Sequence, residues 1–274
     1  TEQSDLLMAI HGRHGESPMP VLAARTPGDC FEAAYEAARI AVEHMTPVLL
    51  LSDGYLGNGS EPWPVPDADA LPPITVRHAT LKTAPHSDGG QFLPYVRDEA
   101  TLARPWALPG TAGLEHRIGG IEKDSKTGGV SYDPANHQLM TDLRAAKVAR
   151  VAQSVAPVEV EGDPDGDVLV VGWGSTYGAI TSAVRRVRGR GVRAGHVHLR
   201  WLNPLPRGLA EALRGYRRVL VPELNAGQLV RILRAEFLVD AESLSKVQGL
   251  PFKAREIEEA ILSMATHPSR PDHA

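Results

Sequence analysis

Apolar positions near the start of the chain change from helical to strand-like periodicity. Residues 31–45 carry apolar side chains at helical spacing, after the helix-start residues Thr26, Pro27 and Asp29. Short apolar runs at residues 20–24 and 48–51 flank this helix and predict buried strands. The pattern predicts a βαβ unit preceded by a helix at residues 2–10.

Two strands make too small a parallel sheet to stand alone, because such a sheet needs several strands and helices on both faces. We therefore expect further strands from residues before Thr1 or from another chain. The chain starts at Thr1 and not at Met, so we interpret Thr1 as a processed end or as the first residue of a fragment.

The segment from residue 53 to 120 is proline-rich, and only residues 74–78 suggest a strand. Long irregular segments usually serve a site or an interface, and we interpret this one as an interface. Asp133 and Pro134 then begin a second helix. Its apolar face carries Leu139, Met140, Leu143 and Ala146.

An acidic segment with proline and glycine, residues 157–167, indicates a domain boundary. Beyond it, predicted strands at 168–171, 192–199, 219–221 and 243–247 alternate with predicted helices at 177–188, 208–213, 225–237 and 254–264. This alternation predicts an open, doubly wound α/β domain.

The composition narrows the functional classes. A chain of 274 residues is long enough for two cores, and its net charge of −4 gives no basic surface for nucleic acid. The single cysteine, Cys30, excludes an internal disulfide and a cysteine metal or cluster site within this chain. No apolar run is long enough to cross a bilayer, so we expect a cytoplasmic protein without nucleic-acid or membrane partners.

Glycines and strand ends provide the candidate chemistry. Gly172, Gly174 and Gly178 follow a strand, but no acidic residue ends the next strand, so a tight packing turn is favoured over a dinucleotide site. Asp53 directly follows a buried strand, where open α/β sheets bind ligands; a turn aspartate is the alternative.

Histidines give weaker signals. His196 and His198 share one face of a strand without an evident third metal ligand, so no metal site is predicted. The group at residues 11–16 is interpreted as a helix end closed by Gly12. Glu115, His116 and Arg117 form a charged group whose arginine suits either a substrate carboxylate or a salt bridge between domains or chains; the charged residues 122–126 are interpreted as a solvated turn.

Eight phrases in order, across almost the whole chain, resemble the alpha subunit of 2-oxoacid:ferredoxin oxidoreductases, most closely the 2-oxoglutarate enzymes. They are "TEQSDLL", "GRHGESP", "LLLSDGYLGNGSEPW", "PGTAGLEHRIGGIEKDSKTGGVSYDPANHQLM", "GWGSTYG", "HLRWLNPLP", "PELNAGQL" and "KVQGLPF". The resemblance implies an α/β fold: a partial, doubly wound pyrimidine-binding domain followed by a transketolase C-terminal-like α/β domain. Residues 1–120 would be the C-terminal half of the thiamine-pyrimidine-binding domain, residues 121–166 an interdomain helix and linker, and residues 167–274 the transketolase-like domain.

The resemblance also implies cofactors and partners. Thiamine diphosphate, magnesium and a [4Fe-4S] cluster would be held mainly by a beta subunit, in an α2β2 enzyme that uses coenzyme A and ferredoxin. The glutamate that activates the pyrimidine is expected before Thr1, in a missing N-terminal part of the alpha chain, so the isolated chain is predicted to be inactive. Asp53, Glu115, His116 and Arg117 remain the substrate or interface candidates.

Two alternatives stay open. The same architecture serves pyruvate or branched 2-oxoacids in related enzymes, and the residues that choose the substrate lie largely outside this chain. A noncatalytic scaffold, which keeps the fold and the interface without the active-site half, is the alternative outside enzymes.

Overall fold

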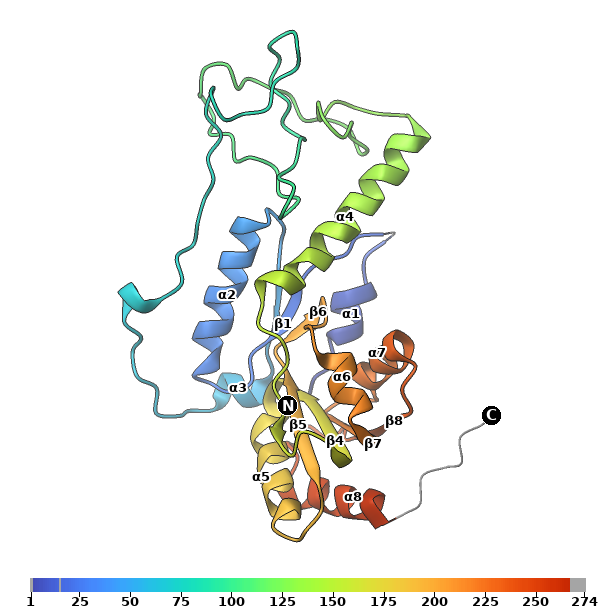
Figure 1. Cartoon of the computed structure of the whole chain (residues 1–274). Coiled ribbons are helices and arrows are strands. Elements are labelled where there is room, and N and C mark those ends of the chain that lie inside the picture. Colours follow the sequence, from blue (N-terminus) through green and yellow to red (C-terminus); the bar gives the residue numbers. More distant parts are fainter. Residues whose placement is uncertain (1, 15, 267–274) are drawn as a thin grey trace.

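The computed structural model describes residues 2–14 and 16–266. It consists of a body with two β-sheets and a long arm of irregular chain that rises from the body (Figure 1). Thr1, interpreted as a processed end or the start of a fragment, and Gly15, within the predicted helix end at residues 11–16, lie outside the described residues.

The smaller sheet has three strands in the order β2-β1-β6. Strands β1 (Val21–Ala23) and β2 (Leu49–Leu51) are parallel and are connected by helix α2 (Asp29–Glu43), which confirms the predicted βαβ unit. Strand β6 (Trp201–Asn203) pairs antiparallel with β1. The expectation that every further strand comes from outside the chain is therefore wrong for β6, because a segment 180 residues later reaches back to β1.

The larger sheet has five strands in the order β3-β5-β4-β7-β8. Strands β4 (Gly166–Trp173), β5 (Ala194–Leu199), β7 (Tyr216–Glu223) and β8 (Ala241–Ser245) are parallel, and the short β3 (Glu161–Gly162) closes one edge antiparallel to β5. Because the chain proceeds from β4 to β5 on one side and later to β7 on the other, the carboxyl end of β4 is a topological switch point.

Helices cover both faces of the larger sheet. Helices α5 (Tyr177–Arg188) and α8 (Ala254–Thr266) share one core cluster with the sheet, and α6 (Leu209–Arg214) and α7 (Gln228–Phe237) share the other. This confirms the predicted α/β class with doubly wound parallel strands.

One hydrophobic core extends through both sheets. Val21 and Ala23 of β1 and Leu6 and Ala9 of α1 (Leu6–His11) belong to the same cluster as the inner residues of β4, β5 and β7. The opposite face of the small sheet packs Leu22 against α2 and the end of α4 (Pro134–Ser154). Helix α1 also packs against α7, so this cluster joins the N-terminal segment to the larger sheet.

The arm, residues 59–133, connects α3 (Gly54–Asn58) with α4 and contains only the short 3-10 helix Ala68–Ala70. The strand expected at residues 74–78 is absent; His78 makes a single isolated bridge to Trp106. The arm has a small apolar cluster of its own, formed by Ala79, Ala84, Phe92 and Leu114. Residues 74–78 themselves contain no proline; only His78 has a bridge partner, so no ladder forms there.

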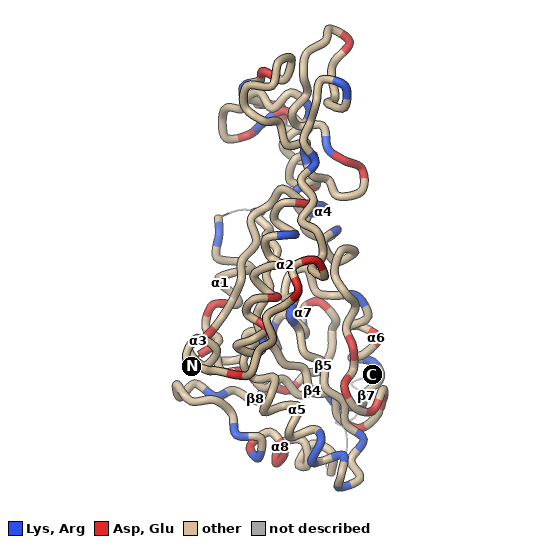
Figure 2. The backbone as a smooth tube through the Cα atoms, turned by 90° about the vertical axis from the view of Figure 1, so that its left-hand side faces the viewer, with Lys and Arg blue, Asp and Glu red and all other residues tan. Residues whose placement is uncertain are grey.

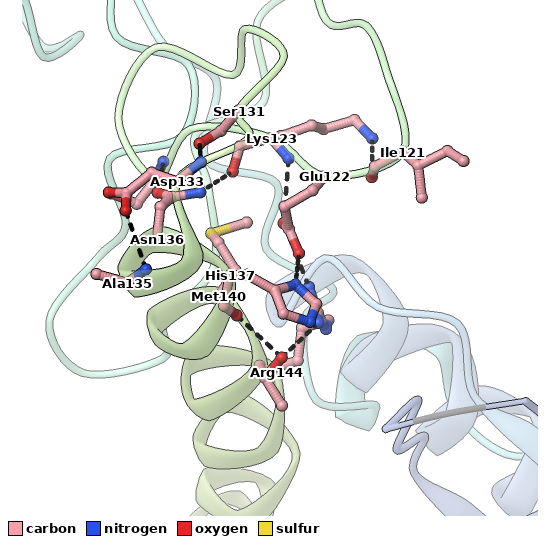
Figure 3. Close-up of polar contacts among 12 residues, drawn as sticks. Ile121, Glu122, Lys123, Ser131, Asp133, Ala135, Asn136, His137, Met140 and Arg144 are labelled. Carbon is pink, nitrogen blue, oxygen red and sulfur yellow. Dashed lines mark hydrogen bonds and ion pairs between the residues drawn. The ribbon is translucent and has the colours of Figure 1, made fainter.

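Where the arm returns to the body, it is hydrogen-bonded to the start of α4 (Figure 3). Asn136 donates to the carbonyl of Lys123 at 2.8 Å and accepts from the amide of Ser125 at 2.9 Å. Glu122 contacts His137 and lies 3.9 Å from the guanidinium of Arg144, and its side chain is only 19% exposed. The interpretation of residues 122–126 as a solvated turn is therefore wrong for Glu122, because it is held against α4.

No helix in residues 2–14 and 16–266 is long and apolar enough to span a membrane. Basic and acidic positions are interspersed along the arm and the body in Figure 2.

We expect Gly172→Ala to destabilise the protein. An added Cβ would lie 2.3 Å from Cδ1 of Ile180, which is fully buried, so we expect a loss of about 1–3 kcal/mol in unfolding free energy. Gly178→Ala is the matched control: nothing lies within 4 Å of its added Cβ, and alanine favours helix α5 by up to about 1 kcal/mol. Chemical denaturation compares the two variants, and equal stability would contradict the packing interpretation of Gly172.

Candidate functional site

The carboxyl ends of β1, β2 and β4 meet where the two sheets join. The turn Gly174–Thr176 follows β4, and Asp53 follows β2; the Ser175 hydroxyl donates a hydrogen bond to Oδ2 of Asp53. A small hollow of about 20 Å³ lies between these ends, lined by Gln3, Leu51, Asp53 and Gly174 among others. We call this region, with the segment Glu2 to Asp5 and the residues after β7, the junction.

Asp53 uses its two carboxylate oxygens for different partners. Oδ1 accepts hydrogen bonds from the amides of Tyr55 at 2.9 Å and Leu56 at 3.2 Å, which caps helix α3. Oδ2 accepts from Ser175 across the sheet junction. The turn interpretation of Asp53 therefore agrees with the structure, and the bridge to Ser175 was not predicted.

The N-terminal segment is bound to the larger sheet through Gln3, which sequence analysis missed. Its side chain is buried, donates to the carbonyl of Trp173 at 2.6 Å and accepts from the amide of Leu224 at 2.9 Å. Gly174 has φ +58, and a Cβ there would lie 2.6 Å from Nε2 of Gln3, so the glycine gives room for this contact. The one signal for Gln3 in the sequence was its place in the phrase "TEQSDLL".

Glu223, at the end of β7, is fully buried and was also missed. Its carboxylate accepts hydrogen bonds from the amides of Leu229 at 2.7 Å and Val230 at 3.1 Å and from the indole of Trp173 at 3.2 Å. Asn225, the first residue of the helix predicted at 225–237, accepts from the amides of Gly227 and Gln228 at 2.8 and 2.9 Å. Glu223 therefore positions α7 and Trp173, and its oxygens are occupied by these donors.

A second polar cluster lies beside the junction, on β5 and α5. The rings of His196 and His198 are 5.4 Å apart, and the ring of Tyr177 lies 5.6 and 5.0 Å from them. The guanidinium of Arg25 lies 4.9 Å above the Tyr177 ring. Among the described residues, no group of three or more His, Cys, Asp or Glu side chains is arranged to hold a metal ion.

Burial controls the electrostatics of this cluster. Burial lowers the pKa of His198 well below its ordinary value, and the neighbouring His196 and Arg25 act in the same direction. Burial also lowers the pKa of His196, against the opposing effect of Glu161. Both histidines are therefore neutral near pH 7. Arg200, two residues after His198, forms an ion pair with Asp29 at 3.1 Å and so has a structural partner within the chain.

The charged group of Glu115, His116 and Arg117 lies on the arm and not at the junction. His116 hydrogen-bonds the carbonyl of Leu114 at 2.7 Å, and its ring packs edge-on against Phe92 at 5.1 Å. Glu115 and Arg117 are exposed and have no hydrogen bond or ion pair within the described part of the chain. Figure 1 shows the arm extending away from α3, so the structure does not bring this group together with Asp53.

The junction does not enclose a cofactor by itself. Its hollow of about 20 Å³ is close to the space of one water molecule, and the carboxylate of Asp53 is already bonded to α3 and Ser175. The strand-end position fits one wall of a cofactor cleft.

Comparisons with known proteins agree with this geometry. Residues 1–132 match the family described as pyruvate flavodoxin/ferredoxin oxidoreductase, thiamine diphosphate-binding, and residues 166–257 match pyruvate:ferredoxin oxidoreductase core domain II. The two matches together cover most of the chain. Residues 1–132 and 166–257 are therefore similar to this family of oxidoreductases.

Within this family, the chain is similar to alpha subunits. It is 55% identical over 259 residues to the 2-oxoglutarate oxidoreductase subunit KorA of Mycobacterium tuberculosis and 32% identical over 271 residues to the alpha subunit of 2-oxoacid:ferredoxin oxidoreductase 1 of Aeropyrum pernix. These matches cover 94% and 96% of this chain but 38% and 41% of the relatives. The chain thus spans about two fifths of the length of these relatives.

A solved structure gives the same result. The 2-oxoglutarate:ferredoxin oxidoreductase of Magnetococcus marinus, solved with 2-oxoglutarate, coenzyme A and succinyl-CoA bound, superposes with a TM-score of 0.86 at 31% identity. The superposition covers 97% of this chain and 45% of that chain. The fold of the described residues, arm included, is therefore a family fold.

We expect Asp53→Ala to destabilise the protein more than Ser175→Ala. Both variants remove the bridge, but Asp53→Ala also removes the cap of α3, which typically contributes about 1 kcal/mol. Asp53→Asn retains an oxygen for the cap and is the control. Denaturant unfolding of the single and double variants measures the coupling; purely additive losses would contradict a direct interaction.

We expect the protein to lose stability as the pH falls below about 6.5, the ordinary pKa of histidine. The folded pKa values of His196 and His198 are lowered, so the unfolded chain binds more protons in this range and protonation favours unfolding. His198→Leu should weaken the dependence, because neither ring nitrogen of His198 has a hydrogen-bond partner within the described residues. Thermal unfolding midpoints between pH 8 and 5.5 test this, and identical slopes for wild type and His198→Leu would contradict it.

Proposed function

We propose that the chain is part of the alpha subunit of a thiamine-diphosphate-dependent 2-oxoglutarate:ferredoxin oxidoreductase. The observation that carries the proposal is the 55% identity to a 2-oxoglutarate oxidoreductase subunit along 94% of this chain. The reaction converts 2-oxoglutarate, coenzyme A and two oxidised ferredoxins to succinyl-CoA, carbon dioxide, a proton and two reduced ferredoxins.

The contribution of this chain is one wall of the cofactor cleft. The ends of β1, β2 and β4 form that wall, and the bonds of Gln3, Asp53 and Glu223 keep it rigid. Such positioning lowers the cost of orienting a cofactor. Thiamine diphosphate supplies the electron sink for decarboxylation when bound, and we place its diphosphate, the magnesium and the [4Fe-4S] cluster mainly on the beta subunit.

The division of the chain follows the same proposal. Residues 1–120 serve as the C-terminal half of the pyrimidine-binding domain, residues 121–166 as the connecting helix and linker, and residues 167–274 as the transketolase-like domain. The pyrimidine-activating glutamate belongs to another part of the alpha chain. The enzyme is cytoplasmic and assembles as α2β2.

The arm is the proposed interface with the beta subunit. Several of its apolar side chains are strongly exposed, including Val65 at 83%, Ile121 at 103% and Tyr132 at 95%. Exposed apolar side chains on a long irregular segment are typical of protein interfaces. Glu115, His116 and Arg117 belong to this surface, with Arg117 in a salt bridge to the partner as the first role and a contact with the substrate carboxylate as the second.

We expect the complete alpha chain with its beta subunit to reduce ferredoxin with 2-oxoglutarate and coenzyme A. The isolated 274-residue chain should be inactive, because its junction alone encloses no cofactor. Steady-state assays with 2-oxoglutarate, pyruvate and a branched 2-oxoacid test the substrate, and we expect kcat/KM to favour 2-oxoglutarate by at least about tenfold. A preference for pyruvate or a branched 2-oxoacid would show that this acid, and not 2-oxoglutarate, is the substrate. An assembled, cofactor-loaded complex without activity would favour the noncatalytic scaffold.

Arg117→Ala separates the two roles in the same assay. A weaker subunit association at unchanged KM indicates the salt bridge, and a raised KM for 2-oxoglutarate at unchanged association indicates the substrate contact. Arg117→Lys is the conservative control, since lysine keeps the charge but loses the two-pronged geometry of the guanidinium.

A further inference from the structure

A cavity of about 650 Å³ lies between the arm and the body. Its wall consists of residues 42–44 at the end of α2, arm residues around 75–85 and 96–106, and Ser154 at the end of α4. This volume is within the range of small-molecule sites in proteins. Gln3, Asp53 and Glu223 of the junction do not line this cavity.

Two arginines on the cavity wall lack an acidic partner. The guanidinium of Arg104 lies 4.4 Å from the centre of the Tyr95 ring and that of Arg97 lies 5.7 Å from it. Arg97 donates to the carbonyl of Tyr95 at 3.1 Å, which leaves its charge unneutralised. Within residues 2–14 and 16–266, neither arginine forms an ion pair, and Arg104 has no hydrogen bond.

Lys147 of α4 does not line the cavity, but it adds a third positive charge near the two arginines. Its Nζ donates to the carbonyl of Met45 at 3.2 Å. Burial, together with Arg97 and Arg104, lowers the pKa of Lys147 to about 8. Three cations are thus held close together, and their mutual repulsion makes the empty arrangement costly.

The two carboxylates on the cavity wall are already bonded elsewhere. Glu43 accepts from Arg39 at 2.8 Å. Asp98 accepts from the amides of Ala100 at 3.1 Å and Thr101 at 2.8 Å and lies 3.5 Å from Arg77, which is exposed. Neither carboxylate on the cavity wall is therefore free to neutralise Arg97, Arg104 and Lys147.

We propose that this cavity binds a small phosphate-bearing molecule, with the phosphate against Arg97 and Arg104. Arginine forks match phosphate oxygens in pairs, and a phosphate with more than one negative charge matches three cations better than a monocarboxylate does. Trp106 and the threonine hydroxyls of the wall provide the rest of the surface. The phosphate is either free, as pyrophosphate, or part of an adenine nucleotide whose base stacks on Trp106.

Calorimetric titration of the assembled holoenzyme at low salt tests the proposal, with sodium pyrophosphate and ADP as probes. We expect saturable binding that weakens with salt, and at least about a tenfold loss of affinity in Arg104→Gln. Lys147→Met should also weaken binding and serves as an independent second variant. Tighter binding of ADP than of pyrophosphate identifies the nucleotide, and equal binding identifies the free phosphate.

Arg255→Gln, an exposed position on α8 with the same change of charge, is the matched control and should bind as wild type. Loss of affinity equal to that of Arg104→Gln in this control would overturn the proposal, as would the absence of saturable binding of both probes. Binding by the isolated chain that disappears in the holoenzyme would overturn it too, because the cations would then meet carboxylates of a partner subunit.

Discussion

The two sheets of the body are joined because β5 of the larger sheet continues almost directly into β6 of the smaller sheet. Strand β5 ends at Leu199 and β6 begins at Trp201, so Arg200 alone separates a residue paired with β4 from a residue paired with β1. The amide of Ala23 donates to the carbonyl of Arg200 at 2.7 Å, and the Arg200 side chain pairs with Asp29. The two sheets therefore cannot move apart without breaking backbone pairing, and their shared apolar core adds to this coupling.

Polar side chains are buried where the two sheets join, and most of them have hydrogen-bond partners. Gln3 and Glu223 use each of their side-chain oxygens or nitrogens on a backbone or indole partner. Unsatisfied buried polar groups cost about 1–3 kcal/mol each, so these bonds are needed to keep the junction folded. His198 is the contrast: both ring nitrogens are buried without a partner in the described residues, and its lowered pKa is the electrostatic consequence.

The sequence predicted the regular elements well where periodicity and caps agreed. The βαβ unit, α4 behind Asp133 and the alternating strands and helices after residue 166 all occur near their predicted positions. Local patterns could not predict β6, because its partner lies 180 residues earlier and a three-residue strand carries no periodicity of its own. The same limit applies to Gln3 and Glu223, whose roles depend on contacts with Trp173, 170 and 50 residues away.

The smaller sheet shows how this chain relates to its longer relatives. Within the described part of the chain, strand β2 pairs only with β1, and Leu50 on it is 39% exposed, although parallel strands normally have both faces and neighbours covered. Asp53 and the junction lie directly at the end of this open strand. Polypeptide that pairs with β2 would therefore extend the small sheet directly beside the junction, where Asp53 bridges the two sheets.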